Sequence, residues 1–261
     1  MTLKPITTNP SDFPLQIQPF MTGAKLFDSS CSPEAQVIFS DKEQGFFIKS
    51  AAKGTLARES ELTRWFHGKG LSAAVVTYIS DEKDWLVTEK VPGDDCTAAK
   101  YIEQPKRLCD MLAERLSIVH STDFAGCPIQ NHTQQYIARA TQNYHAGIYD
   151  QTLFPDNWGY RSAEEAFGVI KKSDGLLKTD TLLHGDYCLP NIIHDDWHFS
   201  GLIDVDSGGV GDRHVDLFWG AWTLFFNLKT DQYRQRFFDC YGRDKVDAEC
   251  LRIVAACEVF G

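Results

Sequence analysis

The sequence predicts an α+β protein with a sheet-rich N-terminal lobe, residues 1–90, and a larger, mainly helical C-terminal lobe, residues 91–261. Between residues 16 and 89, short apolar runs alternate with polar turns, which is typical of antiparallel strands, and one helical segment interrupts them. From Asp95 onward, apolar residues recur at helical spacing instead. With 261 residues, the chain is long enough to bury a core in one or two domains.

Two pairs of strands define the predicted N-terminal sheet. Residues 37–39 and 46–48 are apolar runs joined by the polar turn 40–45, and residues 75–79 and 85–88 flank an acidic turn. Apolar runs separated by short polar turns are the usual sign of hairpins. We therefore expect a hairpin from the first pair and two further strands from the second.

Lys49 and Glu59 are the charged residues of interest in this lobe. Lys49 ends a predicted strand, on the face that it shares with Phe47. Glu59 lies near the apolar face of the predicted helix, where a carboxylate needs a partner, and Glu61 is the competing choice. A lysine at a strand end is commonly solvated, so the residues alone leave this pairing open.

The C-terminal lobe is predicted as a series of helices. Pro105 can open the first one, and Ser162 with Glu165 forms a capping box at the start of another. The remaining predicted helices cover residues 136–148, 216–226, 231–240 and 246–260, and the second of these is apolar nearly all round, which predicts burial. His120 is expected to be a buried or capping histidine rather than a catalytic one.

The most informative stretch runs from residue 183 to residue 219. Asp186 follows a glycine in a tight turn, Asn191 comes five residues later, and Asp204 ends an apolar run. The flanking apolar runs predict a small hairpin that brings the three polar side chains to one end. Phosphoryl transfer uses this set, because one carboxylate orients the attacking hydroxyl and a pair of hard oxygens binds magnesium.

This stretch resembles the catalytic and metal loops of the protein-kinase-like antibiotic kinases. The motif is HGD at 184–186 with Asn191, followed by Ile203 and Asp204. The runs CLPN at 188–191 and GGVGDR at 208–213, with DL at 216–217, resemble the aminoglycoside 3′-phosphotransferases in particular. The resemblance covers nearly the whole chain, and it implies a bilobal protein-kinase-like fold.

The resemblance also implies a site, a reaction and a set of ligands. Asp186 is the expected catalytic residue, and the γ-phosphate of ATP or GTP is expected to move to the 3′-hydroxyl of an aminoglycoside, giving antibiotic resistance. Asn191 and Asp204 are the expected Mg²⁺ ligands. The residues expected to bind the nucleotide are Lys49, Glu59, Ser30, Ser32, Thr88, Glu89 and Val91. The residues expected to bind the cationic substrate are Asp150, Asp156, Glu258 and Phe260.

Three departures from the family pattern bear on the substrate. Asp206 and Ser207 replace a Gly-Arg pair, Asn227 stands near an acidic position, and Gly261 follows the usual last residue. They keep open a kinase with a different acceptor, such as another amino sugar or an amino alcohol. A catalytically inactive nucleotide-binding module is the more remote alternative. A metal hydrolase built on His184, His194 and His198 is disfavoured, because no H-E-x-x-H helix precedes them.

Composition limits the classes of partner and the cellular compartment that we expect for this protein. The net charge of −10 argues against nucleic acid and suits a polycationic small molecule. No apolar run approaches the ~18 residues of a membrane span, and the first residues do not form an apolar signal segment. The eight cysteines show no zinc spacing, so we expect reduced thiols in a cytoplasmic protein.

Overall fold

The computed structural model describes residues 3–149 and 159–261. By its internal contacts, the chain divides into two compact units. The first contains Met1–Ala98 and Pro190–Asp206, and the second contains Ala99–Leu189 and Ser207–Gly261. The lobe boundary at residue 90 stays a prediction. Among the residues described, no helix is both long enough and apolar enough to cross a membrane.

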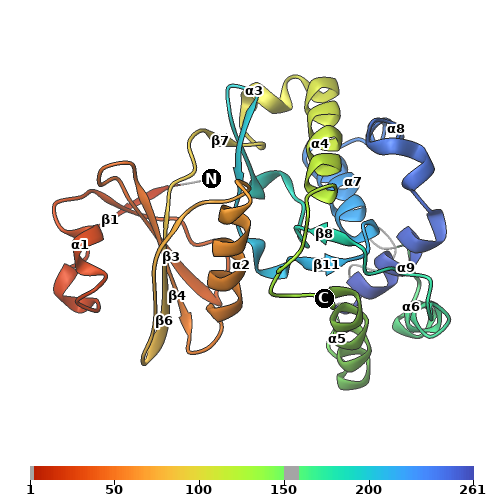
Figure 1. Cartoon of the computed structure of the whole chain (residues 1–261), viewed down its shortest axis with the longest axis horizontal. Coiled ribbons are helices and arrows are strands. Elements are labelled where there is room, and N and C mark those ends of the chain that lie inside the picture. The colour runs from red at the N-terminus through yellow and green to blue at the C-terminus, as the bar shows by residue number, and fades with distance from the viewer. Residues whose placement is uncertain (1–2, 150–158) are drawn as a thin grey trace. The chain divides into compact units, whose positions relative to one another are not determined.

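The first unit is built on an antiparallel sheet with the strand order β1-β2-β3-β4-β6-β5 (Figure 1). The strands are β1 (Lys4–Ile6), β2 (Leu26–Asp28), β3 (Ala35–Ser40), β4 (Phe46–Ala52), β5 (Val75–Ser80) and β6 (Lys83–Glu89). The predicted hairpin is confirmed as β3–β4, and the two further predicted strands pair with each other as β5–β6.

Side chains alternate between the two faces of β4. Phe46 and Ile48 are buried in a core that also contains residues of α1 (Gln18–Met21). Phe47 and Lys49 therefore lie on the other face, as the alternation predicts. This second face of the sheet carries the candidate site.

Helix α2 (Ala57–Gly68) is the helix predicted in the N-terminal lobe. Leu62 and Phe66, four residues apart, are both fully buried and form its apolar stripe. At its start, the backbone N–H of Leu56 donates to the carboxylate of Asp84 at 2.9 Å. This bond satisfies a donor that the first turn of a helix leaves unpaired, and it fixes the helix relative to β6.

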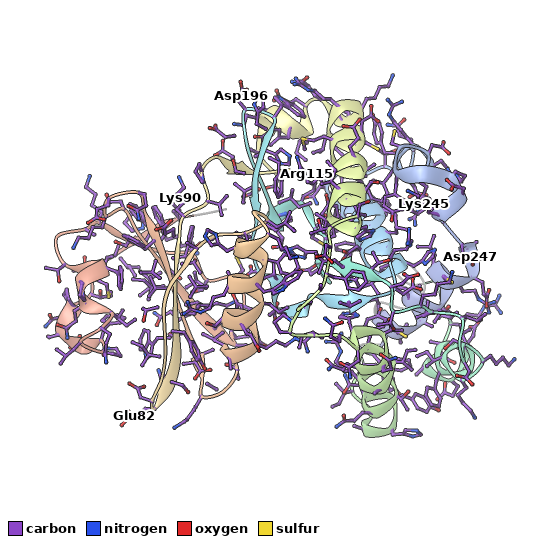
Figure 2. The ribbon with its side chains drawn as sticks, viewed as in Figure 1. Glu82, Lys90, Arg115, Asp196, Lys245 and Asp247 are labelled. Carbon is purple, nitrogen blue, oxygen red and sulfur yellow. The ribbon has the colours of Figure 1, made fainter. Side chains whose placement is uncertain are left out.

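A second sheet of the first unit has the order β10-β9-β7. It is formed by β7 (Asp94–Asp95), β9 (Ile192–Asp195) and β10 (His198–Leu202). Asp196 and Trp197, with φ of 42° and 70°, make the tight turn between β9 and β10, and Figure 2 shows Asp196 at the end of this hairpin. The prediction of helical structure directly from Asp95 is thus wrong, because the backbone there pairs with β9.

The second unit is mainly helical, as predicted. Its helices are α3 (Ala99–Ile102), α4 (Pro105–His120), α5 (His132–Ala146), α6 (Ala163–Ile170), α7 (His214–Leu228), α8 (Arg234–Gly242) and α9 (Ala248–Glu258). The capping bond at Ser162 is confirmed, with Glu165 N–H donating to the serine hydroxyl at 3.2 Å. Helix α5 begins four residues before its predicted start and ends at Ala146, where the next residue, Gly147, caps it in the left-handed conformation.

The strands of this unit correct the single hairpin predicted around Asp186. β8 (Thr181–Leu183) pairs with β11 (Gly209–Gly211) and not with the strands of the β9–β10 hairpin. The runs around Asp186 therefore belong to two pairs of strands: β8 with β11 in the second unit, and β9 with β10 in the first. Apolar runs alone could not assign these partners.

Helix α7 is less buried than the sequence predicts. Most of it lies in the core, but Phe225 and Phe226 are 37% and 49% exposed. The all-apolar pattern therefore describes a buried helix whose last turn reaches the surface.

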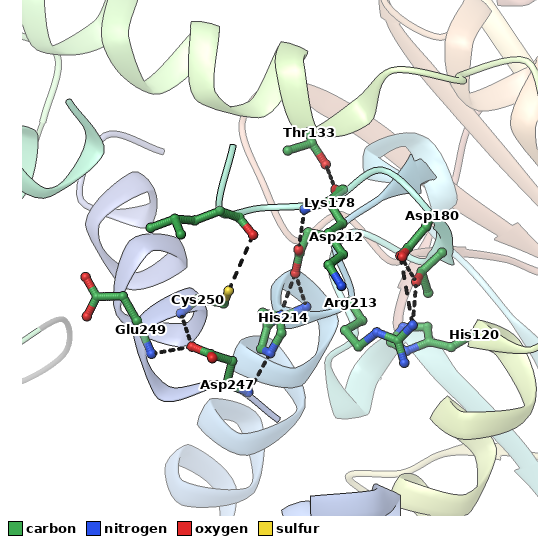
Figure 3. Close-up of polar contacts among 12 residues, drawn as sticks. His120, Thr133, Lys178, Asp180, Asp212, Arg213, His214, Asp247, Glu249 and Cys250 are labelled. Carbon is green, nitrogen blue, oxygen red and sulfur yellow. Dashed lines mark hydrogen bonds and ion pairs between the residues drawn. The ribbon is translucent and has the colours of Figure 1, made fainter. Parts of the chain in front are cut away.

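A polar network ties the starts of α7 and α9 together (Figure 3). Asp212 accepts hydrogen bonds from the backbone N–H of Lys178 at 2.6 Å and from the Nδ1–H of His214 at 2.6 Å. The Nε2 of His214 accepts from the backbone N–H of Asp247 at 2.8 Å, and Asp247 caps α9 through the N–H groups of its first turn. Both ring nitrogens of His214 are thus used, which makes this a structural clamp.

Candidate active site

A pocket of about 260 Å³ lies in the first unit, between α2, the face of the sheet that carries Phe47 and Lys49, and the residues that follow β10. Its lining residues include Ser29, Cys31, Ser32, Phe47, Lys49, Glu59, Thr63, Leu86, Thr88, Glu89, Val91, Ile203 and Asp204. Most of the residues predicted to bind the nucleotide are among them. Ser30 is the exception, since its hydroxyl oxygen accepts the backbone N–H of Val37 at 2.9 Å and so stabilises the loop.

Lys49 makes two ion pairs in this pocket. Its ammonium lies 2.8 Å from Glu59 Oε2 and 3.2 Å from Asp204 Oδ1. The predicted partner Glu59 is therefore confirmed, whereas Glu61 is exposed. The resemblance to the antibiotic kinases selected Glu59, and the structure shows why Glu61 does not serve: only Glu59 lies on the buried face of α2.

The electrostatics of this trio favour a further cation. Burial alone would lower the pKa of Lys49, but the carboxylates of Asp204 and Glu59 outweigh it and raise this pKa. Burial raises the pKa of Glu59 to about 7, against the lowering by Lys49 and with a further increase from Asp204. Two carboxylates thus share one ammonium, so the pocket carries excess negative charge.

Asn191 and Asp204 lie at the base of the β9–β10 hairpin. The backbone N–H of Ile203 donates to the carbonyl of Asn191 at 3.0 Å, which joins the two segments directly. The hairpin is anchored to the segment after α2, where Leu202 N–H donates to the Leu71 carbonyl at 2.8 Å. Asp204 has a φ of 53° and its side chain is 52% exposed.

This donor set fits a magnesium ion. A carboxylate and an amide supply the hard oxygens that Mg²⁺ prefers, and exposure at Asp204 leaves room for water ligands. The excess negative charge around Lys49 favours the same cation. The residues present therefore match the predicted metal chemistry.

Asp186 lies in the second unit, in the turn that follows β8. The preceding Gly185 has a φ of 88°, and a Cβ atom there would overlap the backbone carbonyl of Ser207. Only glycine fits this turn without strain. The N–H of Asp186 donates to Nδ1 of the buried His184 at 3.2 Å, which fixes the turn from inside.

Asp216, on α7, is the residue that holds this turn. Its carboxylate accepts the backbone N–H groups of His184 and Gly185, both at 2.8 Å. The side chain is completely buried. The sequence marked Asp216 only as part of a motif, and its contact with the turn was not predicted, because the two lie on separate segments.

His120 completes the support behind the turn. Its Nε2 lies 3.1 Å from Asp216 Oδ2 and its Nδ1 lies 2.8 Å from the Tyr241 hydroxyl. Burial lowers the pKa of His120 although Asp216 opposes this, so the ring is neutral. Since a carboxylate only accepts, Nε2–H donates to Asp216 and Nδ1 accepts from Tyr241. The predicted buried histidine is confirmed.

Glu258 ends α9 in the same unit. Its Oε1 accepts hydrogen bonds from the Tyr136 hydroxyl at 2.6 Å and from Trp219 Nε1–H at 3.1 Å. Burial raises the pKa of Glu258 to about 7, and the charge of Asp186 acts in the same direction. Tyr136 and Trp219 carry no sequence signal that separates them from ordinary core aromatics.

The other residues predicted for the substrate have different placements. The Phe260 side chain is only 1% exposed and packs against Tyr144 at a ring distance of 5.6 Å, while its carbonyl accepts from Asn143. Asp150 and Asp156 lie outside the residues that the structure describes. Their roles stay predictions.

The pocket with its lysine–glutamate pair and the acid-bearing turn define the class: a phosphotransferase of the protein-kinase-like α+β fold. The model of the "Phosphotransferase enzyme family" matches residues 26–252 of this chain. The chain belongs to this family.

Curated relatives and a solved structure support this conclusion. The chain is 49% identical to a probable aminoglycoside 3′-phosphotransferase of Lactococcus lactis subsp. lactis, over 99% of both chains. It is 28% identical to an aminoglycoside 3′-phosphotransferase of Niallia circulans, over 76% of both. The crystal structure of aminoglycoside-3′-phosphotransferase of type VIII matches with a TM-score of 0.73 and 26% identity, over 92% of this chain and 94% of that one. The predicted fold class is confirmed.

Proposed function

We propose that this chain transfers the γ-phosphate of a nucleoside triphosphate to the 3′-hydroxyl of an aminoglycoside, and so confers resistance. The observation that carries the proposal is the Lys49–Glu59–Asp204 trio in a pocket. An ammonium held between two carboxylates is the arrangement that binds nucleotide phosphates beside a metal. The acceptor is inferred from the relatives, which are aminoglycoside 3′-phosphotransferases.

The nucleotide would occupy the pocket of the first unit. Lys49 binds its phosphates, and Glu59 keeps the ammonium in place. Ser32 lies in the loop that lines the phosphate end, whereas Ser30 shapes that loop. The lining segment Thr88, Glu89 and Val91 meets the base. An aminoglycoside phosphotransferase of Streptomyces rimosus with the same fold, 18% identical, was solved in complex with ADP and streptomycin, which supports nucleotide use by the fold.

Asn191 and Asp204 would hold Mg²⁺, which neutralises charge on the phosphates. Asp186 orients the acceptor hydroxyl and takes its proton as the oxygen bonds to the γ-phosphorus. The bond from phosphorus to the bridging oxygen breaks, and the nucleoside diphosphate leaves. Asp216 maintains the turn that presents Asp186.

The acceptor is a polycation, and acidic groups of the second unit would bind its amines. Glu258 is the described candidate, and Phe260, Asp150 and Asp156 are proposed from sequence. The net charge of −10 supports attraction of such a substrate and argues against nucleic acid. We also propose that the enzyme is cytoplasmic. The boundary between its two lobes is proposed at residue 90, which gives lobes of residues 1–90 and 91–261.

Asn227 favours a second candidate, a kinase of the same fold with another acceptor. Its amide donates to the Thr223 carbonyl at 2.8 Å and to the Thr223 hydroxyl at 3.2 Å. This side chain therefore stabilises its own helix and brings no negative charge to an amine. An amino sugar or amino alcohol with fewer amines would suit such a site.

The test is nucleotide consumption with Mg²⁺, ATP or GTP, and a panel of aminoglycosides with and without a 3′-hydroxyl. We expect consumption only with drugs that carry this hydroxyl, and none with Asp186→Ala, which should still bind nucleotide. Consumption with drugs that lack the hydroxyl would refute the regiochemistry. No consumption with any drug, while nucleotide binds, would favour the other acceptor.

A further inference from the structure

Three helices of the second unit converge on one carboxylate. Glu258 ends α9, Tyr136 belongs to α5 and Trp219 to α7. Tyr136 is buried, and its hydroxyl has two acceptors, Glu258 Oε1 at 2.6 Å and the Val254 carbonyl at 3.2 Å. The shorter distance assigns its proton to the carboxylate.

Both donors reach the same oxygen of Glu258. Tyr136 and Trp219 bind Oε1, while Oε2 takes no hydrogen bond from the part of the chain that the structure describes. Two donors on one oxygen fix the plane of the carboxylate, because it can no longer rotate without breaking both bonds. The second oxygen is left to accept from a ligand.

The charges around Glu258 decide when it is ionised. Burial raises the pKa of Glu258 to about 7. Tyr136, Arg139 and Trp219 act against burial and lower this pKa, whereas the charge of Asp186 raises it further. Arg139 also lies over the Tyr136 ring, 5.9 Å from its centre. A cationic ligand beside Oε2 would lower this pKa again, because opposite charges favour the ionised form.

We propose that Tyr136 and Trp219 are positioning residues that hold Glu258 with Oε2 presented to a protonated amine of the phosphate acceptor. The inference rests on the proposed function for the identity of the acceptor. It assigns to two aromatic residues a role that their burial alone would attribute to packing. Neither touches the reacting atoms, so their effect is on binding of the amine.

Tyr136→Phe separates this role from packing, because it removes one hydroxyl and keeps the ring. We expect the KM and the dissociation constant for kanamycin A to rise about five- to tenfold. The kcat and the KM for nucleotide should stay within twofold. The acid limb of kcat/KM should move to higher pH, since loss of a donor raises the pKa of Glu258.

The matched control is Tyr160→Phe. Tyr160 is buried in the same core and donates its hydroxyl to the Arg252 carbonyl at 2.6 Å, so the control loses an equivalent bond. We expect no change in kanamycin A binding from it. In a Glu258→Gln background, Tyr136→Phe should have less than half of its effect on binding. An equal effect in both backgrounds, or an equal effect of the control, would overturn the inference.

Two readouts separate this inference from the proposed function. Calorimetry measures kanamycin A binding without turnover, and carbon NMR measures the pKa of Glu258 in the free protein. Weaker binding and a raised pKa in Tyr136→Phe support the inference even if wild type phosphorylates no aminoglycoside. An unchanged pKa, or absence of kanamycin A binding by wild type, overturns it.

Discussion

Asp216→Asn should damage both the stability and the rate of this enzyme. The carboxylate accepts three hydrogen bonds inside the second unit: His184 N–H, Gly185 N–H and His120 Nε2–H. Burial would raise the pKa of Asp216, but these donors outweigh it and lower this pKa, so the ionised form is the native one. Asparagine keeps one acceptor oxygen and replaces the other with a donor.

The size of the effect follows from which oxygen is lost. In the wild type, Gly185 N–H donates to Oδ1, while His184 N–H and His120 Nε2–H both donate to Oδ2. If the asparagine carbonyl takes the place of Oδ2, two of these bonds are kept, but the asparagine NH₂ group then faces the N–H of Gly185. Each hydrogen bond to a charged group is worth about 1.5–3 kcal/mol, and an unsatisfied buried donor costs about 1–3 kcal/mol. We expect the free energy of unfolding to fall by about 2–5 kcal/mol. Because the turn carries Asp186, kcat should fall at least about a hundredfold.

Urea unfolding followed by tryptophan fluorescence measures the first effect, and nucleotide consumption with the acceptor from the aminoglycoside panel measures the second. The matched control is Asp231→Asn, since Asp231 pairs with Arg234 at 2.7 Å in an exposed ion pair. Exposed pairs contribute about 0–1 kcal/mol, so this variant should stay near wild type. If the two variants had equal stability, or if Asp216→Asn kept the wild-type kcat, the assigned anchoring of the turn would be refuted.

Three further changes test other features. Gly185→Ala should lower the free energy of unfolding by about 2–4 kcal/mol and remove most activity, because residue 185 has a left-handed φ and the new Cβ would overlap Ser207. The control Gly168→Ala, which has open space on α6, should be neutral or stabilising by ~1 kcal/mol. Urea denaturation and turnover assays measure both variants. Glu258→Gln should be about 1–3 kcal/mol more stable than wild type at pH 8 and similar near pH 4.5. The folded pKa of Glu258, about 7, exceeds its ordinary 4.5, so the wild-type unfolding free energy falls as pH rises through this window, and urea titrations at both pH values measure it. His214→Leu should lose about 2–4 kcal/mol by leaving the N–H of Asp247 unpaired, seen as a lower Tm.

Local patterns predicted those parts of the site that depend on one strand or one helix. Alternation placed Lys49 on the pocket face, and helical spacing placed Glu59 near the apolar face of α2. The choice of Glu59 over Glu61 came from the resemblance to the antibiotic kinases. The capping box at Ser162 needed only four residues. His120 was correctly expected to be buried from its place after an apolar helix face.

Long-range partners could not be predicted from spacing. β8 is a short, mainly apolar run and β11 reads Gly-Val-Gly, and nothing in either one specifies the other as its neighbour. The contact of Asp216 with the turn after β8, and the meeting of Tyr136 with Glu258, join segments that are far apart in the sequence. The exposed end of α7 was missed because an apolar pattern gives no information on where the core stops.

The division of the chain into units has a consequence for the order of its synthesis. The first unit includes residues 190–206, which supply β9, β10 and Asp204. When residue 98 leaves the ribosome, β7 therefore has no strand to pair with, and Lys49 lacks one of its two carboxylates. The pocket around Lys49 can be completed only after the chain has begun the second unit and returned, so the first unit cannot finish folding as a nascent N-terminal domain.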